Sequence, residues 1–159
     1  MSERFLIDKS AFARFSKPGV RRVLKPLITR GVVAICGAVE LEIMHSARSK
    51  ADAIEIREGL SGFDWLPTPD EVWDRAIEVQ ALLTAAGNWR ALSVADLVIA
   101  ATAERHGATV LHYDGDYDMI AAVRTGKPVV PVTPEAKAAR LLSRLSPGLL
   151  RLAARLNVT

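Results

Sequence analysis

The sequence has little cysteine, no long apolar run and only a small excess of charge. Cys36 is the only cysteine among 159 residues, so no intramolecular disulfide can form and an intracellular protein is expected. No apolar run approaches the roughly 20 residues that cross a bilayer. The first residues also lack the basic region and apolar stretch of a signal peptide. We therefore expect a cytoplasmic location.

Internal repeats, low-complexity tracts and long polar linkers are also absent from the sequence. Half of the residues are hydrophobic, which is enough for the core of one domain. We expect a single domain over residues 1–133 and a helical tail over residues 134–159 that packs on the domain or on a partner subunit. The 21 Lys and Arg against 18 Asp and Glu suit a polyanionic partner without requiring one.

Short apolar runs alternate with helical patterns along the chain. The expected strands are 5–7, 32–36, 109–113 and 128–132, and the expected helices are 20–29, 39–47, 69–86, 95–106 and 117–124. Strands that alternate with helices predict an α/β fold, with a parallel sheet covered on both faces. Ligands of such sheets bind beyond the carboxyl ends of the strands.

Four acidic residues are expected near that edge of the sheet. Asp8 and Asp114 follow expected strands, Glu42 lies on an early helix, and Asp96 lies in the first turn of a late helix. Apolar neighbours tether each of them close to the core. A hard cation such as Mg²⁺ takes oxygen ligands, commonly one or two carboxylates together with waters. The four acids therefore predict a divalent-metal site.

Each of these acids, taken singly, also has a structural explanation. Asp96 could complement the dipole of its helix, and Asp8 and Asp114 could be turn residues. Glu42 could be a solvated helix position. The joint arrangement of the four acids favours the metal site over these explanations.

The segments that carry these acids resemble the ordered acidic motifs of PIN-domain ribonucleases, and among them the VapC toxins of bacterial toxin–antitoxin pairs. The segments are residues 5–11, 39–43, 94–101 and 110–117. The resemblance runs from Phe5 to Val132 in the expected order. It implies a PIN-like three-layer α/β/α sandwich with a central, mainly parallel sheet.

The resemblance also implies an activity and a set of site residues. The implied protein is a Mg²⁺-dependent endoribonuclease toxin, with Mn²⁺ as an alternative ion, that hydrolyses structured RNA such as tRNA or rRNA. Its implied partners are a VapB-type antitoxin and a second copy of the chain. The metal-binding acids match Asp8, Glu42, Asp96 and Asp114, and a further catalytic acid matches Asp116.

One position in this match has a rival, and several cations are candidates for RNA contact. Glu40 competes with Glu42, but the family's acid usually precedes an aliphatic residue late in the start of that helix, which favours Glu42 before Ile43. The expected RNA contacts are Lys9, Ser10, Arg48 and Arg90. A wider set could line the same rim, with a solvated helix face as the alternative: Arg14, Lys17, Arg21, Arg22 and Lys25.

Two other functions are compatible with this pattern. The first is another metal-dependent phosphohydrolase or DNA nuclease on a similar acidic site. The second is a non-catalytic RNA-binding module that keeps the PIN-like fold.

Overall fold

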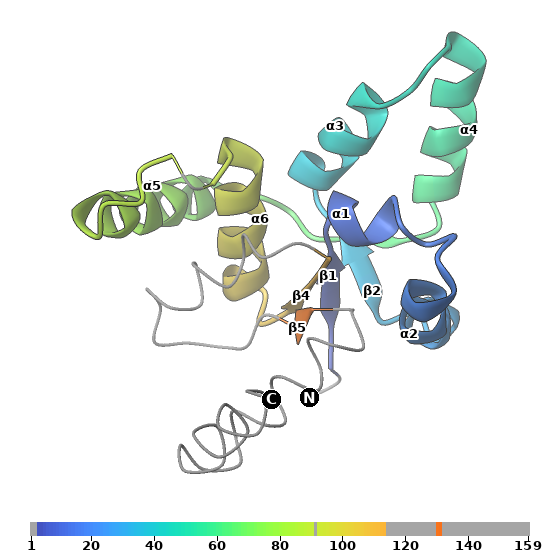
Figure 1. Cartoon of the computed structure of the whole chain (residues 1–159), viewed down its shortest axis with the longest axis horizontal. Helices are drawn as coiled ribbons and strands as arrows, with labels where there is room; N and C mark the ends of the chain where they lie inside the picture. Colours follow the sequence, from blue (N-terminus) through green and yellow to red (C-terminus); the bar gives the residue numbers. More distant parts are fainter. Residues whose placement is uncertain (1–2, 91, 114–129, 132–159) are drawn as a thin grey trace, which may run out of the picture.

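A five-stranded parallel sheet forms the centre of the molecule (Figure 1). The computed structural model describes residues 3–90, 92–113 and 130–131. In chain order the strands are β1 (Phe5–Ile7), β2 (Val33–Ile35), β3 (Asp64–Trp65), β4 (Thr109–His112) and β5 (Val130–Pro131). They lie in the order β3-β2-β1-β4-β5, and every neighbouring pair is parallel. Strand β1 is therefore central, with β2 and β4 on either side.

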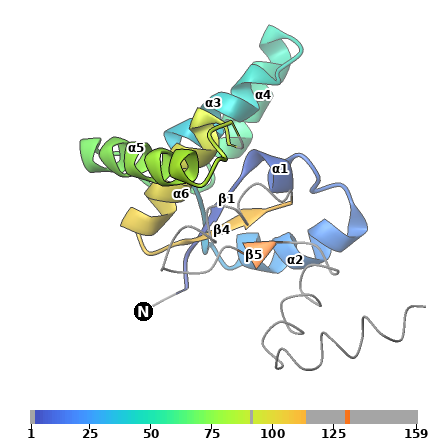
Figure 2. The same ribbon diagram turned by 60° about the vertical axis from the view of Figure 1, so that its left-hand side comes forward.

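Helices cover both faces of this sheet. They are α1 (Lys9–Phe12), α2 (Pro18–Thr29), α3 (Gly37–His45), α4 (Lys50–Leu60), α5 (Asp70–Ala85) and α6 (Val94–Arg105). Figures 1 and 2 show the sheet between α2 on one side and α5 with α6 on the other. The expected α/β/α sandwich is confirmed. No helix in the described part of the chain has the length and apolar character needed to span a membrane.

Burial explains why these segments take these positions. All three residues of β1 and of β2 are buried, as expected for strands covered on both faces. Helix α6 buries seven consecutive residues, Leu97 to Ala103, so it lies inside the molecule rather than on its surface. Gly107 follows that helix with φ of 63°, a left-handed conformation that ends a helix with little strain in glycine.

The expected elements occur where the described residues allow a comparison, with ends that differ by one or two residues. Three elements were not predicted: α1, α4 and β3. The segment after β1 was expected to be a loop, but Lys9–Phe12 is helical because Asp8 caps that helix. The expected turn at 114–116, the helix at 117–124 and the tail at 134–159 lie outside the described residues.

Candidate active site

Asp8 lies at the carboxyl end of the central strand and is buried, with 3% of its surface exposed. Its Oδ2 accepts a hydrogen bond of 2.7 Å from the backbone N–H of Ser10, which makes it the N-cap of α1. Its own backbone N–H donates to the carbonyl of Leu111 in β4, over 2.9 Å. A buried carboxylate requires such hydrogen bonds. Asp8 is therefore held firmly at the junction of two strands.

Helix α3 carries Glu40 and Glu42, the two candidates for the early acidic position, and directs them to different surroundings. Its buried residues, Val39 and Ile43, fix the helix against the core. Glu42 then lines a pocket together with Asp8. Glu40 instead points toward α4, where its Oε1 lies 3.8 Å from Nε of Arg57. The geometry therefore favours Glu42 over Glu40 as the acid beside Asp8, as the resemblance to the family motifs also did.

Asp96 has a structural role as well as a place in the same pocket. Ser93 and Asp96 form a capping box at the start of α6. The Asp96 N–H donates to Ser93 Oγ over 3.1 Å, and Asp96 Oδ2 accepts from Ser93 N at 2.9 Å and from Ser93 Oγ at 2.7 Å. The structural explanation offered for this acid is therefore partly correct. Both hydrogen bonds that the Asp96 carboxylate accepts from Ser93 are made to Oδ2.

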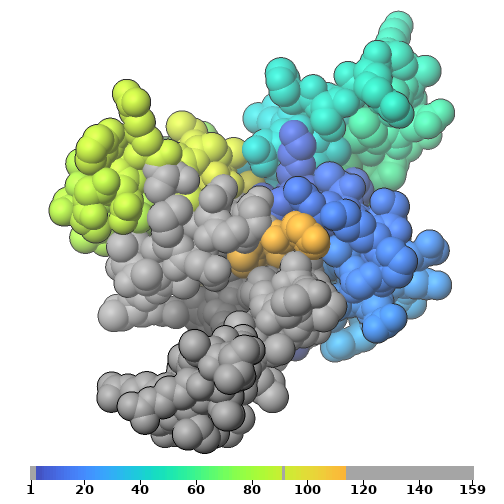
Figure 3. Space-filling model, viewed as in Figure 1, coloured from blue at the N-terminus to red at the C-terminus, as the bar shows by residue number. Residues whose placement is uncertain are grey.

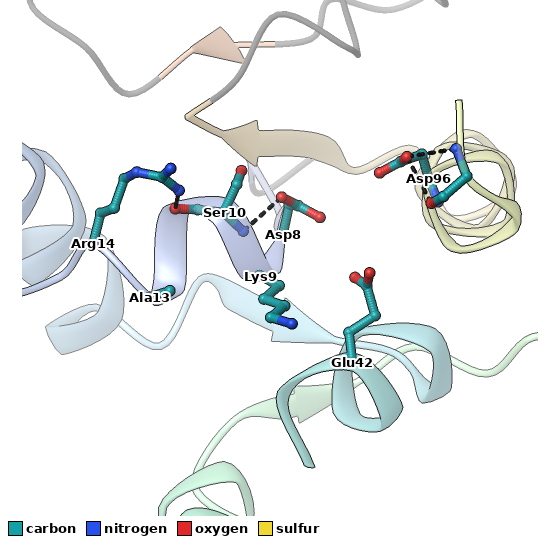
Figure 4. Close-up of a pocket in the computed structure, with 8 residues that line it drawn as sticks. Asp8, Lys9, Ser10, Ala13, Arg14, Glu42 and Asp96 are labelled. Carbon is teal, nitrogen blue, oxygen red and sulfur yellow. Dashed lines mark hydrogen bonds between the residues drawn. The ribbon is translucent and has the colours of Figure 1, made fainter. Parts of the chain in front are cut away.

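These three acids line one pocket of about 320 Å³, called the acidic pocket below. Its lining residues are Asp8, Lys9, Ser10, Ala13, Arg14, Glu42, Ser93 and Asp96. Figure 4 shows the carboxylates of Asp8, Glu42 and Asp96 around the same space, each carried by a different element. Side chains that are up to 88 positions apart in the sequence therefore line one pocket at the carboxyl edge of the sheet.

The acidic pocket fits a hard divalent cation by the chemistry of its donors. Carboxylate oxygens are the ligands that Mg²⁺ prefers, and Mg²⁺ keeps several waters, so it does not require many direct protein ligands. Among the described residues, no three His, Cys, Asp or Glu side chains form a complete ligand cluster by themselves. The two other candidate acids, Asp114 and Asp116, lie outside the described residues.

The chain reaches the edge of the acidic pocket just before Asp114. Strand β4 pairs with β1 so that Leu111 lies opposite Ile7. The backbone N–H of Tyr113 then donates to Ser10 Oγ over 3.0 Å. The residue before Asp114 thus contacts a residue that lines the acidic pocket.

The residues expected to contact RNA fall into two groups. Lys9 and Ser10 line the acidic pocket, whereas Arg48 and Arg90 are not among its described lining residues. Arg48 has 91% of its side chain exposed and lies beside Asp52, with Nε 3.6 Å from Oδ2. Arg14, which the sequence placed only in the wider set of cations, lines the pocket because the unpredicted helix α1 turns it toward Ser10.

Cys36 lies close to this site but is not suited to reaction. It is fully buried and precedes α3. Burial raises the pKa of its thiol, hydrogen bonds with the backbone of Val39 and Ala38 and with Thr102 act in the opposite direction, and the charge of Asp8 raises it further. The thiol therefore stays neutral, as expected for a small core residue.

A second hollow of about 330 Å³, called the apolar groove below, adjoins the acidic pocket and shares Glu42 with it. The groove is lined by Gly37, Ala38, Leu41, Glu42, Thr68, Trp73, Val94, Ala95 and Val98. Figure 3 shows a notch between the atoms of α3 and α4 and those of α5 and α6. Leu41 is 72% exposed, Val94 69% and Trp73 48%, which is unusual for neighbouring large apolar side chains.

Comparison with known proteins agrees with this fold. Residues 5–123 match the model of the PIN domain. Ribonuclease VapC21 of Mycobacterium tuberculosis is 46% identical over 133 residues, which cover 81% of this chain and 94% of that protein. Ribonuclease VapC51 of the same species is 41% identical over 134 residues, which cover 84% and 96%.

Among solved structures, the fold is similar to that of DNA-bound VapBC from Salmonella typhimurium. The TM-score is 0.63 at 15% identity, covering 82% of this chain and 99% of that one. The chain therefore belongs to the PIN-domain family. Within that family it falls among the VapC proteins, as the sequence motifs indicated.

Proposed function

We propose that this chain is a cytoplasmic Mg²⁺-dependent endoribonuclease toxin, with Mn²⁺ as an alternative ion, that hydrolyses phosphodiester bonds in structured RNA. We propose tRNA and rRNA as its substrate classes. The coarser conclusion, a ribonuclease of the hydrolase class, follows from membership of the VapC group, whose members in the comparison are named ribonucleases. The metal, the kind of RNA and the residue roles are the new parts of the proposal.

One observation carries the proposal: Asp8, Glu42 and Asp96 surround one pocket at the carboxyl edge of a parallel sheet. Like charges that share a small space repel each other, so such a site favours a bound cation or a bound proton. The edge is also where ligands bind in open parallel sheets. A site of this kind suits a reaction on a polyanionic substrate only when a cation is present.

In the proposed reaction the carboxylates act chiefly as ligands. A divalent ion bound there would supply an activated water and would offset the charge that develops on the phosphoryl oxygens. Asp8 is held rigidly for this role by its hydrogen bond with Ser10, and Asp96 by its hydrogen bonds with Ser93. Asp114 and Asp116 are proposed as the remaining acids. Lys9 and Ser10 line the pocket at positions suited to contact the substrate phosphate.

Two protein partners belong to the proposal. Several of the similar structures are toxin–antitoxin complexes, which supports a VapB-type antitoxin as one partner. The second partner is another copy of this chain. We propose that the apolar groove forms part of the homodimer contact, because exposed apolar side chains on α3, α5 and α6 line it together.

The first experiment incubates the purified full chain with tRNA and, in parallel, with a DNA duplex. We expect cleavage of the RNA in Mg²⁺, none in EDTA, and little cleavage of the DNA. The Asp8→Asn variant should be inactive, and Asp64→Asn, which removes an exposed acid in β3, should be fully active. Equal cleavage of RNA and DNA would favour the general nuclease. Binding of RNA with no cleavage would favour the non-catalytic module.

The antitoxin is tested separately in cells. Expression of the chain alone should arrest growth, and co-expression of a VapB-type antitoxin from a neighbouring reading frame should restore it. Normal growth under strong expression of the folded chain would count against a toxin.

A further inference from the structure

A strongly basic stretch begins directly after the first acid of the acidic pocket. Residues 9–39 contain seven Lys and Arg and no Asp or Glu. They form α1, α2, β2 and the first three residues of α3. In Figure 3 the surface of this stretch, in blue, lies beside the end of β4, in orange. A surface with cations and no acids borders the acidic pocket and suits a polyanion.

Two cations of this stretch are gathered at one aromatic ring. The guanidinium carbon of Arg14 lies 4.5 Å from the centre of the Tyr113 ring, and Nζ of Lys17 lies 5.1 Å from it. Arg14 also donates from Nη1 to the carbonyl of Ser10 over 2.9 Å. Since Ser10 Oγ accepts from the N–H of Tyr113, the ring and both cations are connected to the wall of the acidic pocket.

These two cations contact a ring, as does Arg21, whose guanidinium carbon lies 5.8 Å from the centre of the Phe15 ring, but the remaining arginines with recorded side-chain contacts differ. Arg48, Arg57 and Arg75 lie beside carboxylates. Within the described residues, no carboxylate lies at ion-pair distance from Arg14 or Lys17. A ring face attracts a cation without neutralising its charge, so its N–H groups can still donate to a phosphate.

A purely structural role for Arg14 is the alternative. Its bond with the Ser10 carbonyl helps to end α1, but this bond uses only one of the five N–H donors of the guanidinium. Lys17 makes no contribution of this kind, because its recorded contact is with the Tyr113 ring. The convergence of both cations on one ring beside the acidic pocket therefore requires another explanation.

We propose that Arg14 and Lys17, oriented by Tyr113, form a phosphate-binding pair for the RNA backbone next to the bond that is cleaved. This inference rests on the proposed function, because it assumes an RNA substrate in the acidic pocket. Arg14 lines that pocket, so a phosphate bound to it would lie next to the site of hydrolysis. The pair adds affinity and fixes the register of the strand without taking part in the chemical step.

The test measures binding of a fluorescein-labelled RNA hairpin to the full chain in EDTA, by anisotropy at about 50 to 200 mM NaCl. We expect the double variant Arg14→Gln/Lys17→Gln to bind more weakly and to lower the slope of log K against log[salt] by about 1.5, since each phosphate contact contributes about 0.7 to 0.9. The charge-matched control Arg4→Gln/Arg105→Gln removes two exposed cations outside residues 9–39, one just before β1 and one in the last turn of α6, and should keep the wild-type slope.

Two further variants separate binding from folding. Lys17→Gln alone, at an exposed position, should lower the slope by about 0.8 with an unchanged melting temperature. Tyr113→Phe keeps the ring and should bind as wild type does, whereas Tyr113→Leu should weaken binding. An unchanged slope in the double variant of a chain that cleaves RNA in Mg²⁺ would overturn this inference alone. Failure of the wild-type chain to bind or cleave RNA would overturn the proposed function as well.

Discussion

The acidic pocket and the apolar groove lie next to each other, share Glu42, and differ in every other lining residue. Leu41 and Glu42 are consecutive on α3, about 100° apart around the helix, so one helix supplies both hollows. Helix α6 likewise contributes to both hollows, with Val94 lining the apolar groove and Asp96 lining the acidic pocket. Neighbouring positions on two helices therefore line separate hollows, for which we propose separate tasks, catalysis in one and homodimer assembly in the other.

The strongest test of this separation is Asp8→Asn in the acidic pocket. We expect kcat/KM on RNA to fall on the order of 10³-fold, because a central ligand charge is lost. The melting temperature should stay equal or rise, since repulsion among the acids decreases and the amide can still accept from Ser10 N–H. Activity within tenfold of wild type would remove Asp8 from the site.

A matched pair on α3 sharpens the comparison. Glu42→Gln should lower kcat/KM by about 10²-fold, as expected for a group that stabilises charge at the reacting atoms. Glu40→Gln, two positions away, should change activity very little, because Glu40 lies beside Arg57 and outside the acidic pocket. A larger loss for Glu40→Gln would show that the assignment of these two residues is reversed.

Substitutions of Asp96 and Ser93 distinguish a role in the reaction from a role in helix capping. Asp96→Asn should lower activity roughly 10- to 100-fold, the range for groups that tune a metal site. Ser93→Ala should instead lower the free energy of unfolding by about 1 kcal/mol, as for other lost N-caps, with a smaller loss of activity. Equal stability losses and unchanged activity in both variants would leave Asp96 with the structural role alone.

A substitution in the apolar groove should weaken the homodimer, whereas the substitutions in the acidic pocket should lower activity. Leu41→Asp places a charge in the proposed homodimer contact, at a cost of about 2 kcal/mol or more, which weakens the dimer at least about 30-fold. Light scattering at matched concentrations measures this, with Ile54→Asp on α4 as a control of similar exposure. An unchanged dimer in Leu41→Asp, or a monomeric wild-type chain, would exclude the groove as the contact.

The smallest effect concerns Cys36, whose thiol lies near both hollows. Burial raises the pKa of this thiol above its ordinary value of 9.0, so it stays protonated in the folded chain. We expect iodoacetamide to modify it only after unfolding. The unfolded thiol ionises at a lower pH than the folded one, so its contribution to the free energy of unfolding is present below that pH and decreases as the pH rises above it. Rapid alkylation of the native chain would contradict this burial.

Much of the fold follows from the sequence because apolar periodicity is local. The strands β1, β2 and β4 are fully or mostly buried runs, and α5 and α6 show regular apolar spacing. Helix α4 lacked this signal, since Leu60 is its only buried residue. Its cap was the available clue, because Ser49 accepts from the N–H of Asp52. Strand β3 has only two residues, too few for any pattern.

The acidic pocket was predictable in outline because parallel strands end at the same edge of the sheet. The position of Asp8 followed from β1, and its role as a cap was missed because caps and turns use the same residue types. The place of Arg14 depends on the direction of α1, which the sequence did not predict. Arg48 was expected near the RNA because of its charge, which stays a prediction, and in the structure it lies beside Asp52 of α4.

The most direct test is a calorimetric titration of the full chain with Mn²⁺, without RNA. Wild type and Asp64→Asn should bind the ion with equal affinity, and Asp8→Asn and Asp96→Asn should each bind it at least about 10-fold more weakly. If wild type binds no divalent ion, or if the Asp8→Asn chain binds Mn²⁺ as tightly as wild type, the acidic pocket is not the metal site.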